Sequence, residues 1–188
     1  MRDSTPLATD VYLPDNVPAP VVLIRTCYDK SSWLTFLPLV AEYLNERGYA
    51  LVAQDVRGKG RSGGVSEPFT HEIEDGYDSL EWVAAQTWCK GRVAMFGDSY
   101  FAFTAWAAMA SGHPALGAVI SRGIATDIQR EVIYRDGTFL YATNSFWAPF
   151  WLDRFVYEVS PPLDWDHRPM AEIIESWLPG RHSVFFDR

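Results

Sequence analysis

The chain has 188 residues, of which 48% are hydrophobic and 21% charged, as in an ordinary soluble globular protein. Its net charge of -8, with no long basic run, argues against a nucleic-acid partner, because phosphate binding needs clustered Lys and Arg. No apolar run approaches the ~20 residues that span a bilayer, and the two cysteines, Cys27 and Cys89, imply no disulfide scaffold, so we expect a cytoplasmic protein without a membrane partner.

The first third of the chain alternates apolar runs with an amphipathic segment, which predicts strands and a helix of an α/β sheet. We expect an edge strand over 7–13, a buried strand over 20–25, a helix over 33–47 and a second buried strand over 49–54. Helical spacing places five apolar side chains of the first helix on one face: Phe36, Leu37, Val40, Tyr43 and Leu44.

The middle third continues this pattern. A loop rich in Gly and Ser over 55–68 is followed by a predicted helix over 74–87, a buried strand over 93–96, a small-residue helix over 100–111 and a strand over 118–121. In the first of these helices, spacing places three side chains on one face: Tyr77, Leu80 and Ala84.

The pattern changes after Thr126, where aromatic residues and prolines crowd 139–165 and clear strands disappear. We interpret 126–188 as a mostly helical insertion that covers the sheet. Aromatic residues make up 15% of the whole chain. They either form a surface that lines a pocket or covers other protein, or they only extend the core, and the sequence leaves these two interpretations open.

The segment 93–100, Val-Ala-Met-Phe-Gly-Asp-Ser-Tyr, passes from an apolar strand through Gly97-Asp98-Ser99 into a helix. A sharp turn at this point lifts the Ser99 side chain above the sheet, at a helix N-terminus where negative charge is favoured. The glycine fits because a side chain two residues before the serine would crowd the turn. The spacing alone is a weak signal, since a serine there can also serve only as the helix N-cap, and Phe101 stands where the usual Gly-x-Ser-x-Gly elbow has its last glycine.

Five segments in the same order resemble the acyl-hydrolase family of cocaine esterase, X-Pro dipeptidyl-peptidases and α-amino acid ester hydrolases. They are the start at 1–12, Arg-Thr-Cys-Tyr-Asp-Lys at 25–30, the glycine-rich loop at 54–64, the helix segment 75–82 with Trp88-Cys89, and Met-Phe-Gly-Asp-Ser-Tyr at 95–100. The resemblance covers residues 1 to about 125. It implies an α/β-hydrolase fold: 1–125 would be the N-terminal part of a core lacking its last strands, and 126–188 the start of a helical cap.

The resemblance also implies roles for three residues. Ser99 would be the nucleophile of a serine acyl hydrolase, and the Tyr28 hydroxyl and the Tyr100 backbone N–H would form the oxyanion hole. The alternative for Tyr28 is a half-buried aromatic residue at a strand end. Ala102 departs from the glycine usual in the family at that position. Asp98, beside the serine, is expected to face solvent at the helix start rather than to influence Ser99.

The sequence contains no recognisable base for Ser99, although this fold places Asp or Glu and then His after the serine in the chain. His113 lies 14 residues after Ser99, roughly 20 Å along a helix, and is excluded. His71 is expected at a rim or the surface, and His167 and His182 in the cap. Asp55 is expected to pair with Arg57 or to cap a turn. Four other aspartates have no distinguishing context: Asp127, Asp136, Asp164 and Asp166.

We therefore expect either a fragment of a longer hydrolase, which we favour, or a natural short form without activity. The leading function is hydrolysis of a small ester or an X-Pro dipeptidyl amide through an acyl-enzyme. The alternative is an inactive α/β module that binds an acyl ligand or a protein partner. No metal-ligand spacing and no cofactor motif is present, so none is expected. The substrate, the activity of this chain alone and any homo-oligomer of the full-length protein stay open.

Overall fold

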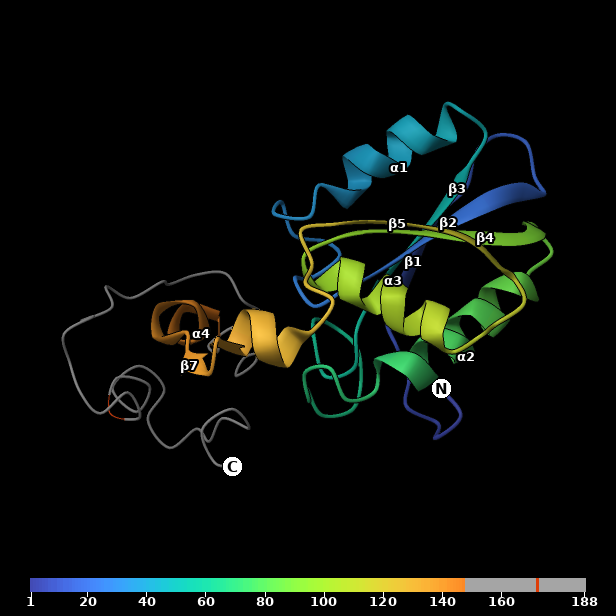
Figure 1. Cartoon of the computed structure of the whole chain (residues 1–188). Coiled ribbons are helices and arrows are strands. Elements are labelled where there is room, and N and C mark those ends of the chain that lie inside the picture. The colour runs from blue at the N-terminus through green and yellow to red at the C-terminus, as the bar shows by residue number, and fades with distance from the viewer. Residues whose placement is uncertain (148–171, 173–188) are drawn as a thin grey trace. The chain divides into compact units, whose positions relative to one another are not determined.

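In the computed structural model, the structure describes residues 1–147 and residue 172 (Figure 1). The chain divides into two compact units, Met1–Ile124 and Ala125–Arg188. The first unit is built on a five-stranded sheet with the strand order β1-β3-β2-β4-β5. Within the described residues, no helix has both the length and the apolar character needed to cross a membrane.

The sheet is parallel except at one edge. Strand β1 (Thr9–Tyr12) runs antiparallel to β3 (Ala50–Asp55), whereas β2 (Ala19–Thr26), β4 (Cys89–Asp98) and β5 (Leu116–Arg122) complete a parallel set. All six residues of β3 are buried, as expected for a strand covered on both faces. The five predicted strands are all present. β4 begins before the predicted start at residue 93 because its first residues are largely exposed and carry no apolar signal.

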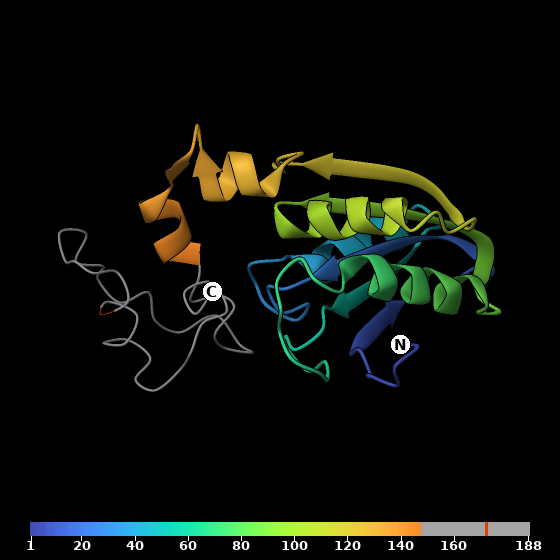
Figure 2. The same ribbon diagram turned by 60° about the horizontal axis from the view of Figure 1, so that its bottom comes forward.

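Helices cover both faces of this sheet (Figures 1 and 2). Helix α1 (Leu37–Asn45) lies on one face, and α2 (Glu72–Ala84) and α3 (Tyr100–Ala110) lie on the other. Two apolar clusters fill the spaces between these layers. The cluster under α2 and α3 contains Val21, Leu23, Val52, Leu80, Val83, Val93 and Met95 among others, and the smaller cluster under α1 contains Ile24, Leu37, Ala41, Leu51 and Ala53.

Helix α1 is shorter than the predicted 33–47, and two of the five side chains predicted to share its apolar face do not pack with the others. Phe36 has a left-handed backbone conformation (φ 52°), which stops the helix from extending toward residue 33, and Pro38 occupies the first turn. Leu37, Val40 and Leu44 pack toward the sheet as predicted. Phe36 and Tyr43 are exposed, and the Tyr43 ring lies under the Arg47 guanidinium.

Helix α2 begins two residues before the predicted 74–87 and ends three residues before its end. Leu80 is buried as predicted, together with Val83. Tyr77 instead packs edge-on against the His113 ring, with 4.6 Å between ring centroids. A methyl group at Gly76 would lie only 2.9 Å from the Ala108 Cβ, so this glycine brings α2 and α3 into close contact.

The described part of the second unit contains a π-helical turn η1 (Gln129–Ile133), a hairpin of β6 (Tyr134–Arg135) and β7 (Thr138–Phe139), and helix α4 (Tyr141–Trp147). The hairpin was not predicted, because two-residue strands are too short to show alternation. Asp136 and Gly137 form its turn, and both have positive φ, which is the usual Asp-Gly hairpin geometry. The rest of the expected cap, including most of 139–165, lies outside the described residues.

Candidate active site

Tyr28 and Ser99 lie 71 residues apart in sequence, and the sheet topology brings them together. Tyr28 follows the end of β2 and Ser99 follows the end of β4, and these two parallel strands are neighbours. Between β2 and β4 the direction of chain progression across the sheet reverses. From β2 the chain first adds β3 on one side and then crosses back to add β4 on the other side. In open α/β sheets such a switch point, at the carboxyl ends of the strands, is where ligands bind.

Ser99 is the corner between β4 and α3, and its backbone is strained. Its φ of 56° and ψ of -128° are a combination that L-residues seldom adopt. The backbone N–H of Ser99 donates to the Arg122 carbonyl at 3.0 Å, which fixes the corner to the end of β5. The serine is exposed, so the turn presents its side chain above the sheet edge.

The small residues around the corner are explained by the close approach of α3. A Cβ atom added to Gly97 would lie far inside van der Waals contact with the carbonyl group of Phe101, so only glycine fits there. At the position where the family usually has another glycine, the methyl group of Ala102 is fully buried. The space under the helix therefore accommodates this departure from the family pattern.

The Ser99 hydroxyl lies 3.0 Å from the Tyr28 hydroxyl, and either oxygen can donate the hydrogen bond. Ser99 stands at the N-cap position of α3, but its side chain makes no capping hydrogen bond. The simpler interpretation of the serine as a helix cap is therefore wrong. The half-buried Tyr28 ring contacts the edge of Phe101, with 5.6 Å between centroids, and this contact orients the phenol toward the corner.

Tyr100 is the first residue of α3, so its backbone N–H lies at the N-terminal end of the helix, where the helix dipole favours negative charge. Its side chain is buried beneath the corner. The hydroxyl donates to Glu72 Oε1 at 2.7 Å and accepts the Phe69 N–H at 3.1 Å. Burial, and then the Glu72 charge, raise the pKa of Tyr100 well above its ordinary value. The hydroxyl therefore stays protonated and remains a donor.

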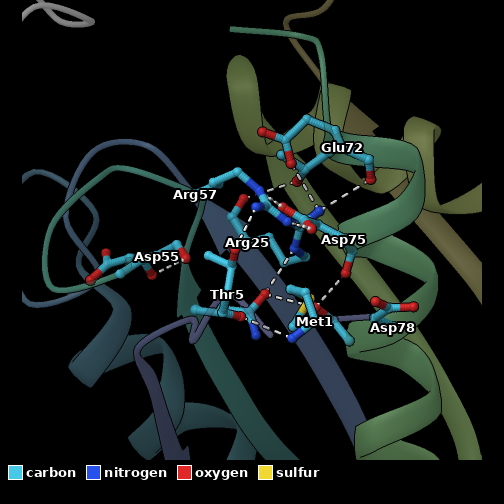
Figure 3. Close-up of polar contacts among 12 residues, drawn as sticks. Met1, Thr5, Arg25, Asp55, Arg57, Glu72, Asp75 and Asp78 are labelled. Atoms are coloured by element: carbon cyan, nitrogen blue, oxygen red, sulfur yellow. Dashed lines mark hydrogen bonds and ion pairs between the residues drawn. The ribbon is translucent and has the colours of Figure 1, made fainter. Parts of the chain in front are cut away.

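A buried ionic network lies below the corner, between β2 and the first turns of α2 (Figure 3). The Arg25 guanidinium is 0% exposed and lies 2.9 Å from Glu72 Oε2. Asp75 forms a two-point ion pair with Arg57, at 2.6 and 3.0 Å, and this pair raises the pKa of the Arg57 guanidinium. Sequence reasoning missed Glu72, Asp75 and the role of Arg25. The available signal was an arginine near the end of an apolar strand and three acidic residues in the first turn of a helix.

Of two aspartates near the site, Asp98 departs from expectation, whereas Asp55 follows one of its two predicted roles. Asp98 does not only face solvent, because its carboxylate is paired with the Arg122 guanidinium at the end of β5. Asp55 caps its turn as one alternative predicted, accepting the Lys30 N–H at 2.8 Å and the Arg61 N–H at 3.2 Å, and burial raises its pKa. The other alternative, pairing of Asp55 with Arg57, is wrong, because Arg57 pairs with Asp75.

Among the residues that the structure describes, no histidine hydrogen-bonds to Ser99. His71 contacts Glu67 at 3.1 Å, and His113 is buried against Glu81 at 2.8 Å. Asp127 accepts the Arg130 N–H in the second unit. Four of the other residues considered above lie outside the described part of the chain: His167, His182, Asp164 and Asp166. That part also contains no cluster of three or more side chains suited to hold a metal ion.

Comparison with known sequences gives two findings. A family model described as X-Pro dipeptidyl-peptidase (S15 family) matches residues 3–169. Cocaine esterase from Rhodococcus sp. (strain MB1 Bresler) is 40% identical over 141 residues, a region that covers 73% of this chain and 24% of the esterase. The chain thus spans about a quarter of the length of this relative.

Solved structures agree with this result. An aminopeptidase from a marine sediment archaeon (Thaumarchaeota archaeon) matches with a TM-score of 0.70 at 26% identity, over 86% of this chain and 31% of the other. A CocE/NonD family hydrolase from Staphylococcus aureus matches with a TM-score of 0.69 at 26% identity, over 82% of this chain and 32% of the other. The expected α/β-hydrolase fold is confirmed, and the chain contains part of it.

Proposed function

Because the chain belongs to the X-Pro dipeptidyl-peptidase (S15) family of hydrolases, we propose that it carries the nucleophile and oxyanion hole of a serine acyl hydrolase. The observation that supports this proposal most strongly is the exposed Ser99 hydroxyl, which sits on a strained corner, makes no capping bond and lies 3.0 Å from the Tyr28 hydroxyl. Strained backbone at a ligand-binding edge of the sheet is a common feature of catalytic corners.

In the proposed reaction, Ser99 Oγ forms a bond to the carbonyl carbon of an ester or of an X-Pro dipeptidyl amide. The carbonyl oxygen becomes an oxyanion, which accepts hydrogen bonds from the Tyr28 hydroxyl and the Tyr100 N–H. Collapse of the tetrahedral intermediate expels the alcohol or amine with the proton taken from Ser99. A water molecule then attacks the acyl-enzyme and releases the acid, which regenerates the serine.

A general base must take the proton from Ser99, and we propose that it comes from outside this chain. The two described histidines are engaged with Glu67 and Glu81. The chain spans about a quarter of its esterase relative, so the parent protein has room for a later acid and histidine. We therefore propose that the chain is the N-terminal part of a longer hydrolase. The net charge of -8 favours a small-molecule or short-peptide substrate over a nucleic acid.

The test is hydrolysis by the full-length protein that contains this chain. Nitrophenyl esters and X-Pro nitroanilides serve as substrates, and the Ser99→Ala variant is compared with the wild type. We expect the variant to lose activity by a factor on the order of 10³ or more, because nucleophile and base act as a unit. Ser111→Ala is the matched control, since it makes the same change at the other end of α3, where the hydroxyl only contacts the Ala108 carbonyl. Equal activity of Ser99→Ala and the wild type would refute the proposal.

The second candidate is an inactive module that binds an acyl ligand or a protein partner, and it is favoured by the lack of a described histidine at Ser99. A fluorophosphonate probe separates the two functions in the full-length protein. Covalent labelling of Ser99, located by peptide mass spectrometry and lost in Ser99→Ala, supports the enzyme. A full-length protein that hydrolyses no substrate and takes up no label supports the binding module.

A further inference from the structure

Glu72, in the first turn of α2, contacts Tyr100 through its carboxylate. Tyr100 is the residue whose backbone N–H is the proposed main-chain donor of the oxyanion hole. Glu72 Oε1 accepts the Tyr100 hydroxyl at 2.7 Å, and both side chains are buried. The same hydroxyl accepts the Phe69 N–H, and the Tyr100 ring packs against Phe69 and Phe103, with centroids 5.3 and 5.7 Å away. The Tyr100 side chain is therefore fixed along its whole length, and its backbone N–H lies at the corner.

Glu72 is itself held in place by a buried cation. Its second oxygen, Oε2, lies 2.9 Å from Arg25 Nη1, and Arg25 Nη1 also donates to the Glu72 carbonyl oxygen at 3.3 Å. Arg25 Nε donates to Gln54 Oε1 at 2.9 Å, so the guanidinium is fixed from β3 as well. A carboxylate paired with a fixed, buried guanidinium holds the hydroxyl that it accepts more rigidly than water would.

Arg25 also links the network to the second proposed donor. Arg25 lies near the end of β2, three residues before Tyr28, and the Thr104 hydroxyl of α3 donates to the Arg25 carbonyl oxygen at 2.9 Å. The segment after β2 that carries Tyr28 and the start of α3 that carries Tyr100 are therefore both linked to one buried arginine. The close contact of Gly76 with Ala108 holds α2 against α3, which lets Glu72 reach Tyr100.

We propose that Glu72, paired with Arg25, is a positioning residue of the oxyanion hole, which holds the Tyr100 amide at a fixed distance from the Tyr28 hydroxyl. This inference rests on the function proposed above. As a positioning residue, Glu72 makes no contact with the substrate. It acts through the Tyr100 side chain, so its loss moves the N–H donor away from the developing oxyanion while the rest of the substrate site keeps its shape.

The first experiment uses Tyr100→Phe in the full-length protein. The substitution removes the hydroxyl but leaves the ring and the Arg25–Glu72 pair in place. We expect kcat to fall by about 10- to 100-fold with KM nearly unchanged, because a misplaced donor is felt mainly in the transition state. A boronic acid, which mimics the tetrahedral intermediate at Ser99, should lose affinity by a similar factor, whereas a product carboxylic acid should bind as before.

The second experiment compares Glu72→Gln with Glu72→Ala. Both variants remove the nearer of the two carboxylates that face Arg25 and leave only Asp75, 3.9 Å away, so they share that structural penalty. Only the glutamine retains an oxygen that can accept the Tyr100 hydroxyl. We expect Glu72→Gln to keep a higher kcat and a tighter boronic acid affinity than Glu72→Ala. Asp3→Asn is the matched control, because it breaks a peripheral contact to Arg57 and touches neither Arg25 nor Tyr100.

The outcomes separate the two proposals. Full activity of Ser99→Ala overturns the proposed function, whatever the other variants do. An inactive Ser99→Ala together with unchanged kcat and boronic acid affinity in Tyr100→Phe overturns only the role of Glu72. Should Tyr100→Phe fail to fold, the glutamine–alanine comparison decides, and equal kcat values in those two variants refute the positioning role.

Discussion

At the scale of single residues, the two hydroxyl groups of Ser99 and Tyr28 share one hydrogen bond at 3.0 Å. Each of them is placed by a different part of the chain. The strained backbone of the corner places Ser99, and the Tyr28 N–H donates to the Thr26 hydroxyl at 3.0 Å, which shapes the turn after β2. Each hydroxyl can therefore be removed by a separate substitution to measure its part in the proposed reaction.

Tyr28→Phe removes one of the two proposed oxyanion donors and leaves the ring that packs on Phe101. We expect kcat of the full-length protein to fall by about 10²- to 10³-fold, which corresponds to ~3–4 kcal/mol of lost transition-state stabilisation. Steady-state kinetics on a nitrophenyl ester measures this change. A retained melting temperature confirms that the loss is chemical, and a kcat equal to that of the wild type would show that Tyr28 is only a packing residue.

At the scale of elements, the corner between β4 and α3 illustrates what local sequence could predict. An apolar strand, Gly-x-Ser and a small-residue helix predicted the order of elements and the place of Ser99. The ends of α1 and α2 could not be predicted as well, because the left-handed conformation of Phe36 has no signature in an apolar, helix-compatible stretch. The pairing of Arg25 with Glu72 could not be predicted from the sequence either. Glu72 lies 47 residues further along the chain, and only the packing of α2 brings it close to Arg25.

Gly97→Ala tests how tightly β4 and α3 approach each other. The added methyl group would overlap the carbonyl of Phe101, so either the corner or the helix must shift. We expect a loss of ~1–3 kcal/mol in the free energy of unfolding, together with slower fluorophosphonate labelling of Ser99, because the serine moves with the corner. Urea unfolding and labelling rates measure the two effects.

Gly91→Ala is the control for this prediction, since no atom lies within 4 Å of a Cβ placed there. Gly91 has a φ of 87°, so alanine at this position carries backbone strain without a clash. It should lower stability while leaving the labelling rate of the folded protein unchanged. Identical labelling in Gly97→Ala and the wild type would contradict the steric argument.

At the scale of the whole molecule, ion pairs hold the N-terminal segment to α2 and to the loop after β3. Asp78 accepts the Arg2 backbone N–H at 2.6 Å and the guanidinium at 2.7 and 3.0 Å, and Asp3 contacts Arg57 at 2.6 Å. The hydrogen bond from Arg2 lowers the pKa of Asp78, and the one from Arg57 lowers the pKa of Asp3. These contacts join residues that are 76 and 54 positions apart in the sequence.

This arrangement predicts an acid-dependent loss of stability. A carboxylate with a lowered folded-state pKa stabilises the protein at pH values above its unfolded-state pKa, near 3.9, and this contribution is lost as the pH falls through the folded-state value. We therefore expect Asp78→Asn to be less stable than the wild type at pH 6, and the difference to shrink as the pH falls from about 4 to 2. Urea unfolding at several pH values measures it.

Asp15→Asn is the control, because Asp15 has no ion-pair partner in the described part of the chain. The difference in the free energy of unfolding between Asp15→Asn and the wild type should not shrink in the same way as the pH falls. A constant stability difference between Asp78→Asn and the wild type across this pH range would mean that the Arg2 contact does not lower the pKa of Asp78 in solution.

The apolar core consists of a larger cluster on one face of the sheet and a smaller cluster on the other. The two proposed oxyanion donors are supported from different clusters. Tyr100 rests on the side of α2 and α3, whereas Tyr28 rests on Phe101, which packs on the smaller cluster under α1. A layer with less buried apolar surface opens more easily by local unfolding. On warming, we therefore expect the support of Tyr28 to be lost before the molecule unfolds, so that the proposed hydrolysis declines at temperatures where the rest of the fold still protects its amides from hydrogen exchange.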